Sequence, residues 1–184
     1  MDLATIGREA AKKGIGVVAT GDCLHPRWLE EVRKLPEEGG LFWLGGTAFV
    51  LTVEVEDSSK VHHLIIVPGL SKASELAEAF SCRERILEAD GRPALPMTPP
   101  EIADAALEAD CLIGPSHAFT PWTGMYAHYP SLAECYQDRS SQIKYVELGL
   151  SADSDYADRI SELRDRTFLS NSDAHSPWPD KLGR

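Results

Sequence analysis

A chain of 184 residues is long enough for one domain with its own hydrophobic core and too short for us to expect two. Its 43% hydrophobic and 26% charged residues are ordinary for a globular protein, and no apolar run approaches the roughly 20 residues that a membrane-spanning helix needs. The formal net charge of −11 argues against a uniformly basic surface for nucleic acid and taken alone favours a small-molecule substrate. We expect a single domain over residues 1–184, located in the cytoplasm because no signal peptide is visible.

Helix and strand patterns alternate in the first part of the chain. Residues 1–13 form an amphipathic helical pattern that stops at Gly14, and the apolar residues 15–20 follow as a strand. Residues 48–55 and 61–67 are two further strand patterns, and the short polar link between them predicts a hairpin.

The second part of the chain continues this alternation. Thr98 to Glu101 carries a capping box with proline at the first helical position, which opens a helix through residue 109. The other expected elements are a helix at 71–80, strands at 111–115, 145–150 and 167–170, a helical turn at 131–137 and a helix at 154–164. Two stretches with Gly, Pro and charged residues, 36–46 and 81–97, are expected to be loops. The pattern predicts an α/β fold with a largely parallel sheet, in which the hairpin is the one antiparallel piece.

The cysteines are widely spaced and include no Cys-x-x-Cys pair. We therefore expect buried, reduced thiols and no structural zinc knuckle. The residues concerned are Cys23, Cys82, Cys111 and Cys135.

Polar side chains that can bind metal recur close to the ends of the predicted strands. The carboxyl ends of parallel strands face a common edge, so residues far apart in sequence can converge there. Imidazoles mixed with carboxylates suit zinc, manganese or iron, and two or three such ions can activate water and hold both sides of a phosphate ester. The candidates are Asp22, Glu54, Glu56, His62, His63, His117, Glu147, Asp173 and His175.

Each candidate also has a structural explanation. A single histidine at a strand end is more often hydrogen-bonded for stability than bound to metal, and strand glutamates can face solvent. His62 and His63 point to opposite faces of their strand, so at most one of them enters a site directly. Asp173 and His175 share one face of an extended segment, which is the spacing that a shared metal needs. The number of such positions near strand ends favours a site.

An aromatic cluster follows His117 directly. Its members can pack over the edge of the sheet, or they can form a wall on which a nucleobase stacks, and the sequence leaves both alternatives open. The cluster consists of Phe119, Trp122, Tyr126 and Tyr129.

Several segments of the chain together resemble the endonuclease Q family, a group of PHP-type (polymerase-and-histidinol-phosphatase) phosphoesterases. HAFTPW at 117–122 and SNSDAHSP at 170–177 are long enough to be specific. The other matching segments are VATGD (18–22), TVEVED (52–57), KVHHLI (60–65), DGRP (90–93) and VELGLSADSDYADRI (146–160).

The resemblance implies a distorted (β/α)7 barrel with a cluster of two or three divalent metal ions at its mouth, zinc being expected and manganese or magnesium the alternatives. It also implies nicking of DNA on the 5′ side of deaminated bases and abasic sites. The family's metal positions match Asp22, Glu54, His63, His117, Asp173 and His175, of which Asp22, Glu54, His117 and Asp173 would be catalytic. Phe119, Trp122 and Tyr126 would bind the substrate.

One family feature is missing from this sequence. The first barrel strand of the family carries a His-x-His pair, and no such pair occurs before Gly14. We therefore expect a fragment, truncated at both ends relative to the family and lacking the first barrel strand. Two alternatives remain: a PHP-type phosphatase acting on a small phosphate monoester, and an inactive module used for binding.

Overall fold

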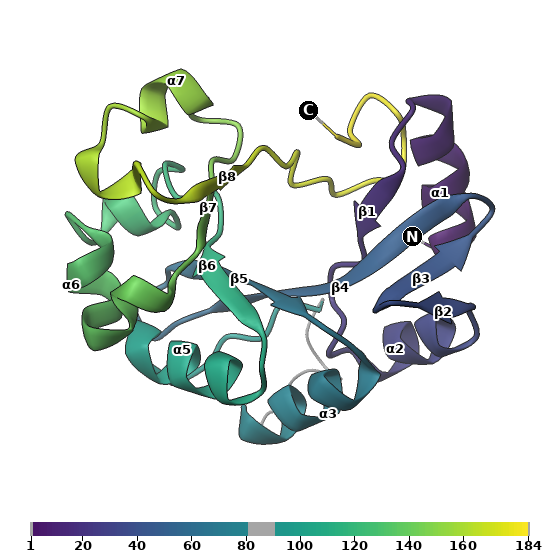
Figure 1. The fold of residues 1–184 in the computed structure, drawn as a ribbon, viewed down its shortest axis with the longest axis horizontal. Coiled ribbons are helices and arrows are strands. Elements are labelled where there is room, and N and C mark those ends of the chain that lie inside the picture. The colour runs from purple at the N-terminus through teal and green to yellow at the C-terminus, as the bar shows by residue number, and fades with distance from the viewer. Residues whose placement is uncertain (1, 81–90, 184) are drawn as a thin grey trace.

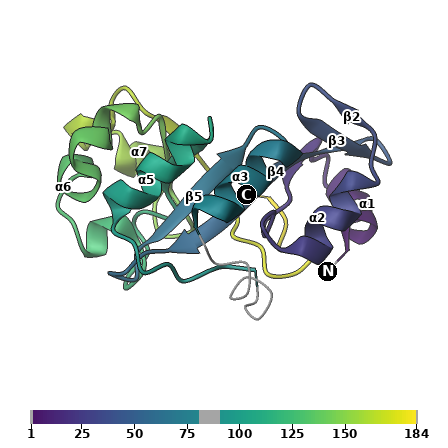
Figure 2. The same cartoon turned by 90° about the horizontal axis from the view of Figure 1, so that it is seen from below.

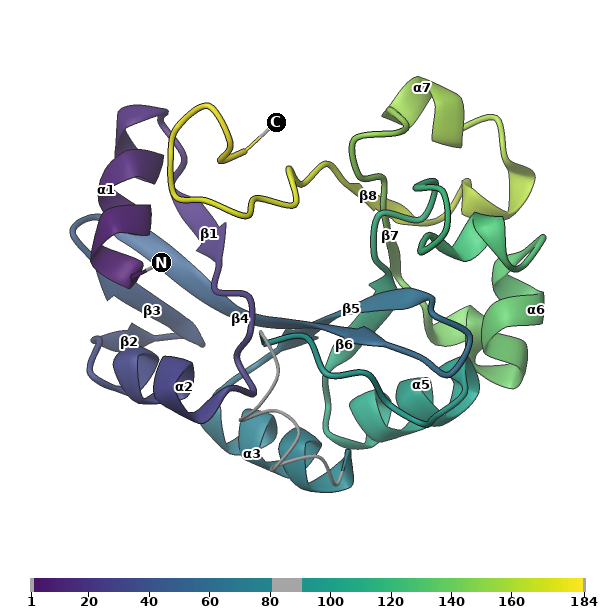
Figure 3. The same ribbon diagram turned by 180° about the vertical axis from the view of Figure 1, so that it is seen from behind.

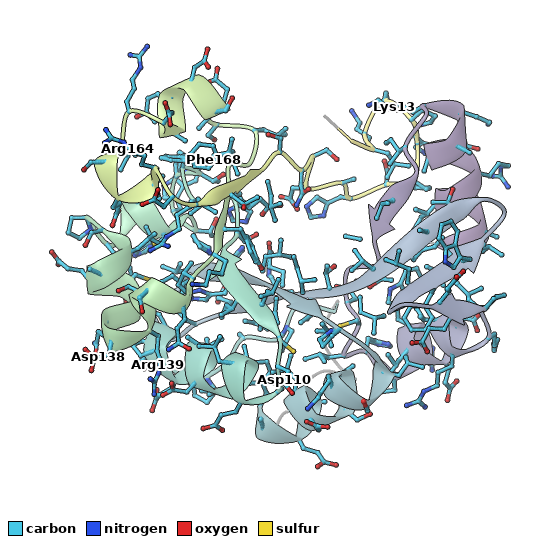
Figure 4. The ribbon with its side chains drawn as sticks, viewed as in Figure 1. Lys13, Asp110, Asp138, Arg139, Arg164 and Phe168 are labelled. Carbon is cyan, nitrogen blue, oxygen red and sulfur yellow. The ribbon has the colours of Figure 1, made fainter. Side chains whose placement is uncertain are left out.

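The computed structural model describes residues 2–80 and 91–183. Most of its strands line the inner side of an open arc, and most of its helices lie on the outer, convex side (Figure 1). The segment after the last strand crosses the open side of the arc toward the N-terminal helix, as the opposite view also shows (Figure 3). A hydrogen bond from Lys13 Nζ to the carbonyl oxygen of Leu182 fixes this return (Figure 4).

The chain begins with a layer of short elements on one arm of the arc. These are α1 (Leu3–Lys12), β1 (Val17–Ala19), α2 (Pro26–Arg33), β2 (Glu37–Glu38) and β3 (Leu41–Leu44). The carboxylate of Asp2 accepts the Thr5 N–H at 2.8 Å and caps α1. The sequence patterns did not predict α2, and they indicated a loop at 36–46, where β2 and β3 lie. Strands this short, separated by glycine turns, have a local pattern that resembles a loop.

The long strand β4 (Thr47–Glu56) organises the main sheet. Its first half pairs in parallel with β1 and antiparallel with β3, and its second half pairs antiparallel with β5 (His62–Val67). β5 in turn pairs antiparallel with β6 (Leu112–Pro115). The predicted hairpin is confirmed, but the prediction of a largely parallel sheet is wrong: among the described pairings, only β1–β4 and the separate pair β7–β8 are parallel. The links at 45–46 and 57–61 are too short for the crossover that parallel neighbours require.

The remaining elements cover the convex side and the second arm, as the view from below shows (Figure 2). They are α3 (Leu70–Ala79), α5 (Pro99–Glu108), η1 (Met125–Ala127), α6 (Leu132–Tyr136), η2 (Gln137–Gln142), β7 (Tyr145–Glu147), α7 (Ser154–Ala157), η3 (Ser161–Leu163) and β8 (Thr167–Leu169). The capping box at Thr98 and Glu101 is confirmed. The predicted helix at 154–164 is instead two short helices, α7 and η3.

The core lies around β4, where Phe49, Leu51, Val53 and Val55 are fully buried. Cys23, Cys111 and Cys135 are buried and unpaired, as predicted, while Cys82 lies outside the described residues. Within the described part of the chain, none of the helices has the length and apolar character needed to span a membrane.

A buried polar group fixes the β4–β5 hairpin. One carboxylate oxygen of Asp57 accepts the backbone N–H groups of Ser59 and Val61, at 2.7 and 2.9 Å. The other lies 3.2 Å from His63 Nε2, and His63 Nδ1 lies 2.7 Å from the hydroxyl of Tyr136. Asp57 therefore joins the turn to the buried side of the sheet.

We predict that Asp57→Ala lowers the free energy of unfolding by about 2–4 kcal/mol, because it leaves buried donors without an acceptor. Urea denaturation of the metal-free protein measures this change. The exposed Asp155, replaced in the same way, serves as control and should change stability by less than about 0.5 kcal/mol. Equal effects of the two substitutions would contradict the role assigned to Asp57.

Candidate metal centre

Three side chains from different segments converge on the concave side of the sheet. His62 Nδ1 lies 3.1 Å from Glu54 Oε1 and 3.1 Å from His117 Nε2, and His117 Nε2 lies 3.5 Å from Glu54 Oε2. Ligands about 2.0–2.2 Å from a tetrahedral zinc ion are roughly 3.3–3.5 Å apart. The distances, which involve both Glu54 oxygens, are close to this spacing, so the three side chains could share one divalent ion. The mixture of imidazole and carboxylate suits zinc or manganese.

The register of the hairpin produces this arrangement. Glu56 on β4 stands directly opposite His62 on β5, so Glu54, Glu56 and His62 share one face of the sheet. His62 Nε2 lies 3.1 Å from Glu56 Oε2, while Nδ1 faces Glu54 and His117. A carboxylate on the far ring nitrogen orients a metal-binding histidine and increases its basicity. Glu56 is thus placed to support His62.

A buried carboxylate, Glu147 on β7, positions His117. One of its oxygens accepts the backbone N–H of His117 at 2.8 Å and lies 2.8 Å from the Ser116 hydroxyl, whose single hydrogen is shared between Glu147 and Glu54. Its other oxygen accepts the side-chain amide of Asn171 at 2.7 Å. The backbone at Gly149 approaches His117 so closely that a Cβ there would lie 2.5 Å from His117 Cβ. His117 is therefore held from two sides, by Glu147 and by the chain at Gly149.

The electrostatics of Glu54 favour the binding of a cation. Burial alone would raise the pKa of Glu54, but hydrogen bonds from His117, His62 and Ser116 outweigh it and hold the pKa well below its usual range. Burial opposes the charged form of His117 too, yet contact with Glu54 raises the pKa of that imidazole above its ordinary value. Glu54 is thus ionised at neutral pH.

The histidine that faces this centre is His62, not the predicted His63. His63 is fully buried on the opposite face, where Asp57 and Tyr136 engage both of its ring nitrogens. By contrast, His117 Nδ1 is buried and has no hydrogen-bond partner among the described residues. The geometry therefore favours His62 over the predicted His63 as a candidate metal ligand. Because the hairpin places Glu56 opposite His62, counting outward from the turn identifies His62 as the histidine on the face of the two glutamates.

The other predicted ligands lie around this trio without joining it. Asp22 follows β1 and packs against Gly91, where a Cβ would lie 2.1 Å from the Asp22 carboxyl carbon. Asp173 acts electrostatically on His117, and its Oδ1 lies 3.6 Å from His175 Nε2. The side chain of His175 is 83% exposed and lies outside the core.

Backbone strain coincides with the predicted site. Seven described residues other than glycine have a positive φ, and four of these are predicted site residues. Such conformations cost free energy for residues with a Cβ and gather at functional sites. The four are Asp22 (46°), His117 (30°), Trp122 (72°) and Asp173 (48°).

The predicted aromatic wall is partly a supporting structure. Tyr126 stacks on Phe119 with ring centroids 5.0 Å apart, and its hydroxyl donates to Glu162 at 2.7 Å. Phe119 in turn contacts Tyr156 edge to face at 5.5 Å. Tyr156 was not among the predicted site residues; it stands 9 residues after Glu147 in a segment expected to be helical.

The exposed aromatic surface lies at Trp122 and Tyr156, whose exposed fractions are 83% and 58%. Tyr156 borders a shallow pocket of about 230 Å³. The pocket is lined by Leu150, Ser151, Ala152, Asp153 and Tyr156. Since Gly149 contacts His117, this pocket begins one residue away from the backbone that touches the candidate metal centre.

The two adjacent histidines allow a matched test of the metal centre. We predict that His62→Gln weakens zinc binding by roughly 100-fold or more because it removes a ligand. His63→Gln should instead lower the free energy of unfolding by about 1–3 kcal/mol and leave zinc affinity within a few-fold. Zinc titration and urea denaturation of both variants provide the measurements. The reverse pattern would restore His63 as the ligand.

No protein-family model matches the chain. An uncharacterised Bacillus subtilis protein, YqxK, is 30% identical to it over 186 aligned positions, which cover 94% of this chain and 47% of that protein. An uncharacterised protein of Methanocaldococcus jannaschii is 32% identical over 123 residues, 67% of this chain and 14% of that protein. The chain thus spans less than half the length of these relatives.

Solved structures are more informative. The lesion-specific endonuclease Q of Pyrococcus furiosus superposes with a TM-score of 0.94 at 48% identity, over 100% of this chain and 46% of that one. Endonuclease Q bound to a 27-mer duplex with an abasic lesion at its active site gives a TM-score of 0.93, also at 48% identity, over 100% of this chain and 47% of that one.

A proposed metal-dependent phosphoesterase from Bifidobacterium adolescentis shares the fold, with a TM-score of 0.61 at 13% identity over 99% of this chain and 87% of that one. The similarity to endonuclease Q extends over the whole chain, including the segments that carry the candidate metal centre. The chain therefore resembles endonuclease Q in sequence and fold over its whole length, and it shares the fold of the metal-dependent phosphoesterase.

Proposed function

We propose that this chain is the metal-dependent nuclease domain of a DNA-repair endonuclease that nicks DNA 5′ of deaminated bases or abasic sites. The observation that carries the proposal is the 48% identity to endonuclease Q over the full chain, including a structure with an abasic-site duplex at the active site. The convergence of Glu54, His62 and His117 supports it, since a hydrolase of this kind needs metal ligands at that position.

We propose that the domain binds two or three divalent ions and that zinc is the preferred ion. Glu54, His62 and His117 would hold one ion, and Asp22, Asp173 and His175 would complete the set. Bound ions would supply Lewis-acid activation of water and of the scissile phosphate. The protein's part is to hold the ligands: Glu56 orients His62, and Glu147 orients His117.

The lesion nucleotide is proposed to lie beside His117, against Trp122 and Tyr156. Exposed aromatic rings hold unstacked bases at about 1–3 kcal/mol per base. Phe119 and Tyr126 would act mainly by supporting Tyr156, through the ring contacts and the bond to Glu162.

The domain proposed is a single catalytic unit over residues 1–184 whose sheet completes a (β/α)7 barrel. In the described part of the chain, β1 pairs on one side only, with β4, and Val17 on it is 57% exposed. Among the described strands β1 is therefore an edge strand, and its second edge is suited to pair with a further strand. Action on cellular DNA would place the protein in the cytoplasm.

A second candidate is a phosphatase for a small phosphate monoester. The net charge of −11 favours it, because a long polyanion gains little from an acidic surface. Comparing turnover of a phosphorylated small molecule with nicking of a duplex that carries one uracil or one abasic site separates the two. The proposal predicts nicking that a chelator abolishes and that zinc or manganese restores. Turnover of the monoester alone would overturn it.

The carboxylate and imidazole on the C-terminal segment provide a further test. We predict that Asp173→Asn or His175→Ala lowers nicking by about 100-fold at unchanged stability, because each removes a metal ligand from an exposed position. Asp180→Asn serves as a matched control, because Asp180 lies on the same segment and 69% of its side chain is exposed. Unchanged nicking by both site variants would remove Asp173 and His175 from the site.

The exposed tryptophan tests the proposed lesion pocket. We predict that Trp122→Ala weakens binding to an abasic-site or uracil duplex by about 1–3 kcal/mol, through the loss of a stacking surface. Fluorescence anisotropy measures the affinity, and Trp43→Ala on β3 serves as control. A loss that is the same for lesion-containing and undamaged duplex would argue against a role in lesion recognition.

A further inference from the structure

A cationic side chain, Arg92, contacts the candidate metal centre. Its Nη1 lies 3.1 Å from Glu54 Oε1, the same oxygen that lies 3.1 Å from His62 Nδ1. The side chain of Arg92 is 44% exposed, whereas that of Glu54 is 21% exposed. Arg92 therefore reaches the centre from the solvent side.

The backbone on both sides of Arg92 is fixed to the site. Gly91 has φ +89° and packs against the Asp22 carboxyl group, where any Cβ would clash. On the other side, Pro93 accepts the Glu56 N–H at 3.0 Å, and Leu95 donates to the Glu56 carbonyl at 2.8 Å. The chain thus anchors Arg92 at the rim of the centre while leaving its guanidinium accessible.

Charge explains why a cation is needed there. The centre is built from carboxylates, among them Glu54, Glu56, Glu147 and Asp173, which repel a phosphate group. Metal ions offset part of this charge at the centre but not along the approach to it. A guanidinium at the rim binds phosphate oxygens in a two-pronged geometry that few other groups can match.

We propose that Arg92 is a substrate-binding residue that holds a phosphate of the DNA strand next to the metal centre. A metal ion and Arg92 compete for Glu54 Oε1, so metal binding releases the guanidinium toward the substrate. Arg92 thus contacts Glu54 before loading and a DNA phosphate afterwards. This inference rests on the proposed function, because it takes the substrate to be a phosphodiester.

The test uses the complete natural protein loaded with zinc. It compares the unaltered form with its Arg92→Gln and Arg92→Lys variants. The ligand is a duplex with one abasic site and an uncleavable methylenephosphonate link on its 5′ side. Arg139→Gln is a matched control. Arg139 lies on the outer surface, where it pairs with Asp104, and 43% of its side chain is exposed, as against 44% for Arg92 (Figure 4). DNA affinity is measured at several salt concentrations, zinc affinity by titration, and nicking on the cleavable duplex.

We expect Arg92→Gln to weaken DNA binding about 10-fold or more and to reduce the salt slope by about 0.9, as the loss of one phosphate contact requires. Arg92→Lys should restore the slope but not the full affinity, and zinc affinity should stay equal or rise. DNA affinity and slope unchanged in Arg92→Gln, with zinc affinity lowered, would show that Arg92 only supports Glu54 and would overturn the inference.

The unaltered protein separates this inference from the proposed function. If it nicks the abasic duplex while Arg92→Gln binds and nicks equally well, only the role of Arg92 fails. If the unaltered protein neither binds nor nicks that duplex, the proposed function fails and the inference fails with it. If the unaltered protein binds the duplex without nicking it, the role of Arg92 is still decided, by comparing the DNA affinity and salt slope of the unaltered protein with those of Arg92→Gln.

Discussion

The register of the β4–β5 hairpin is the constraint on which the candidate site depends. It places Glu54, Glu56 and His62 on the concave face and His63 on the buried face. A slip of β5 by one residue would turn His62 away from the two glutamates and His63 toward them. Asp57 secures the register, because it binds two backbone N–H groups of the turn and the ring of His63 together. The metal-binding face and the core-facing side of the hairpin are therefore set by the same turn.

The sequence predicted the composition of the site better than its geometry. Glu54 and His117 lie where the strand-end argument expects them, and the β4–β5 hairpin forms as predicted. The choice between His62 and His63 depends on pairing register, which composition and periodicity do not specify. The contact of Arg92 with Glu54 joins residues 38 positions apart, and the segment around Arg92 has the local pattern of a loop. Such long-range contacts follow from tertiary packing, so local patterns do not reveal them.

Backbone strain and the burial of charged groups cost folding free energy, and hydrogen bonds within the site offset part of this cost. Buried carboxylates and imidazoles lose hydration, and positive φ at His117 adds to the cost. Glu147 recovers part of it by accepting hydrogen bonds from the His117 backbone and from Asn171, and it shares the Ser116 hydroxyl with Glu54. Glu54 remains ionised because its neighbours donate to it, which leaves a negative charge poised for a cation. The centre is therefore organised for a divalent ion by contacts within the described chain alone.

This organisation changes how the acidic composition should be interpreted. A net charge of −11 speaks against DNA binding only if the protein surface itself must attract phosphate. Here part of the acidic charge is concentrated in a centre whose donor atoms suit divalent ions, and ions bound there would make the local field more positive. On the proposed function, metal loading precedes substrate binding, since the same carboxylates that repel DNA attract the ions. The acidic centre is then a requirement for phosphate binding, and cations at the rim such as Arg92 extend the positive field toward the approaching strand.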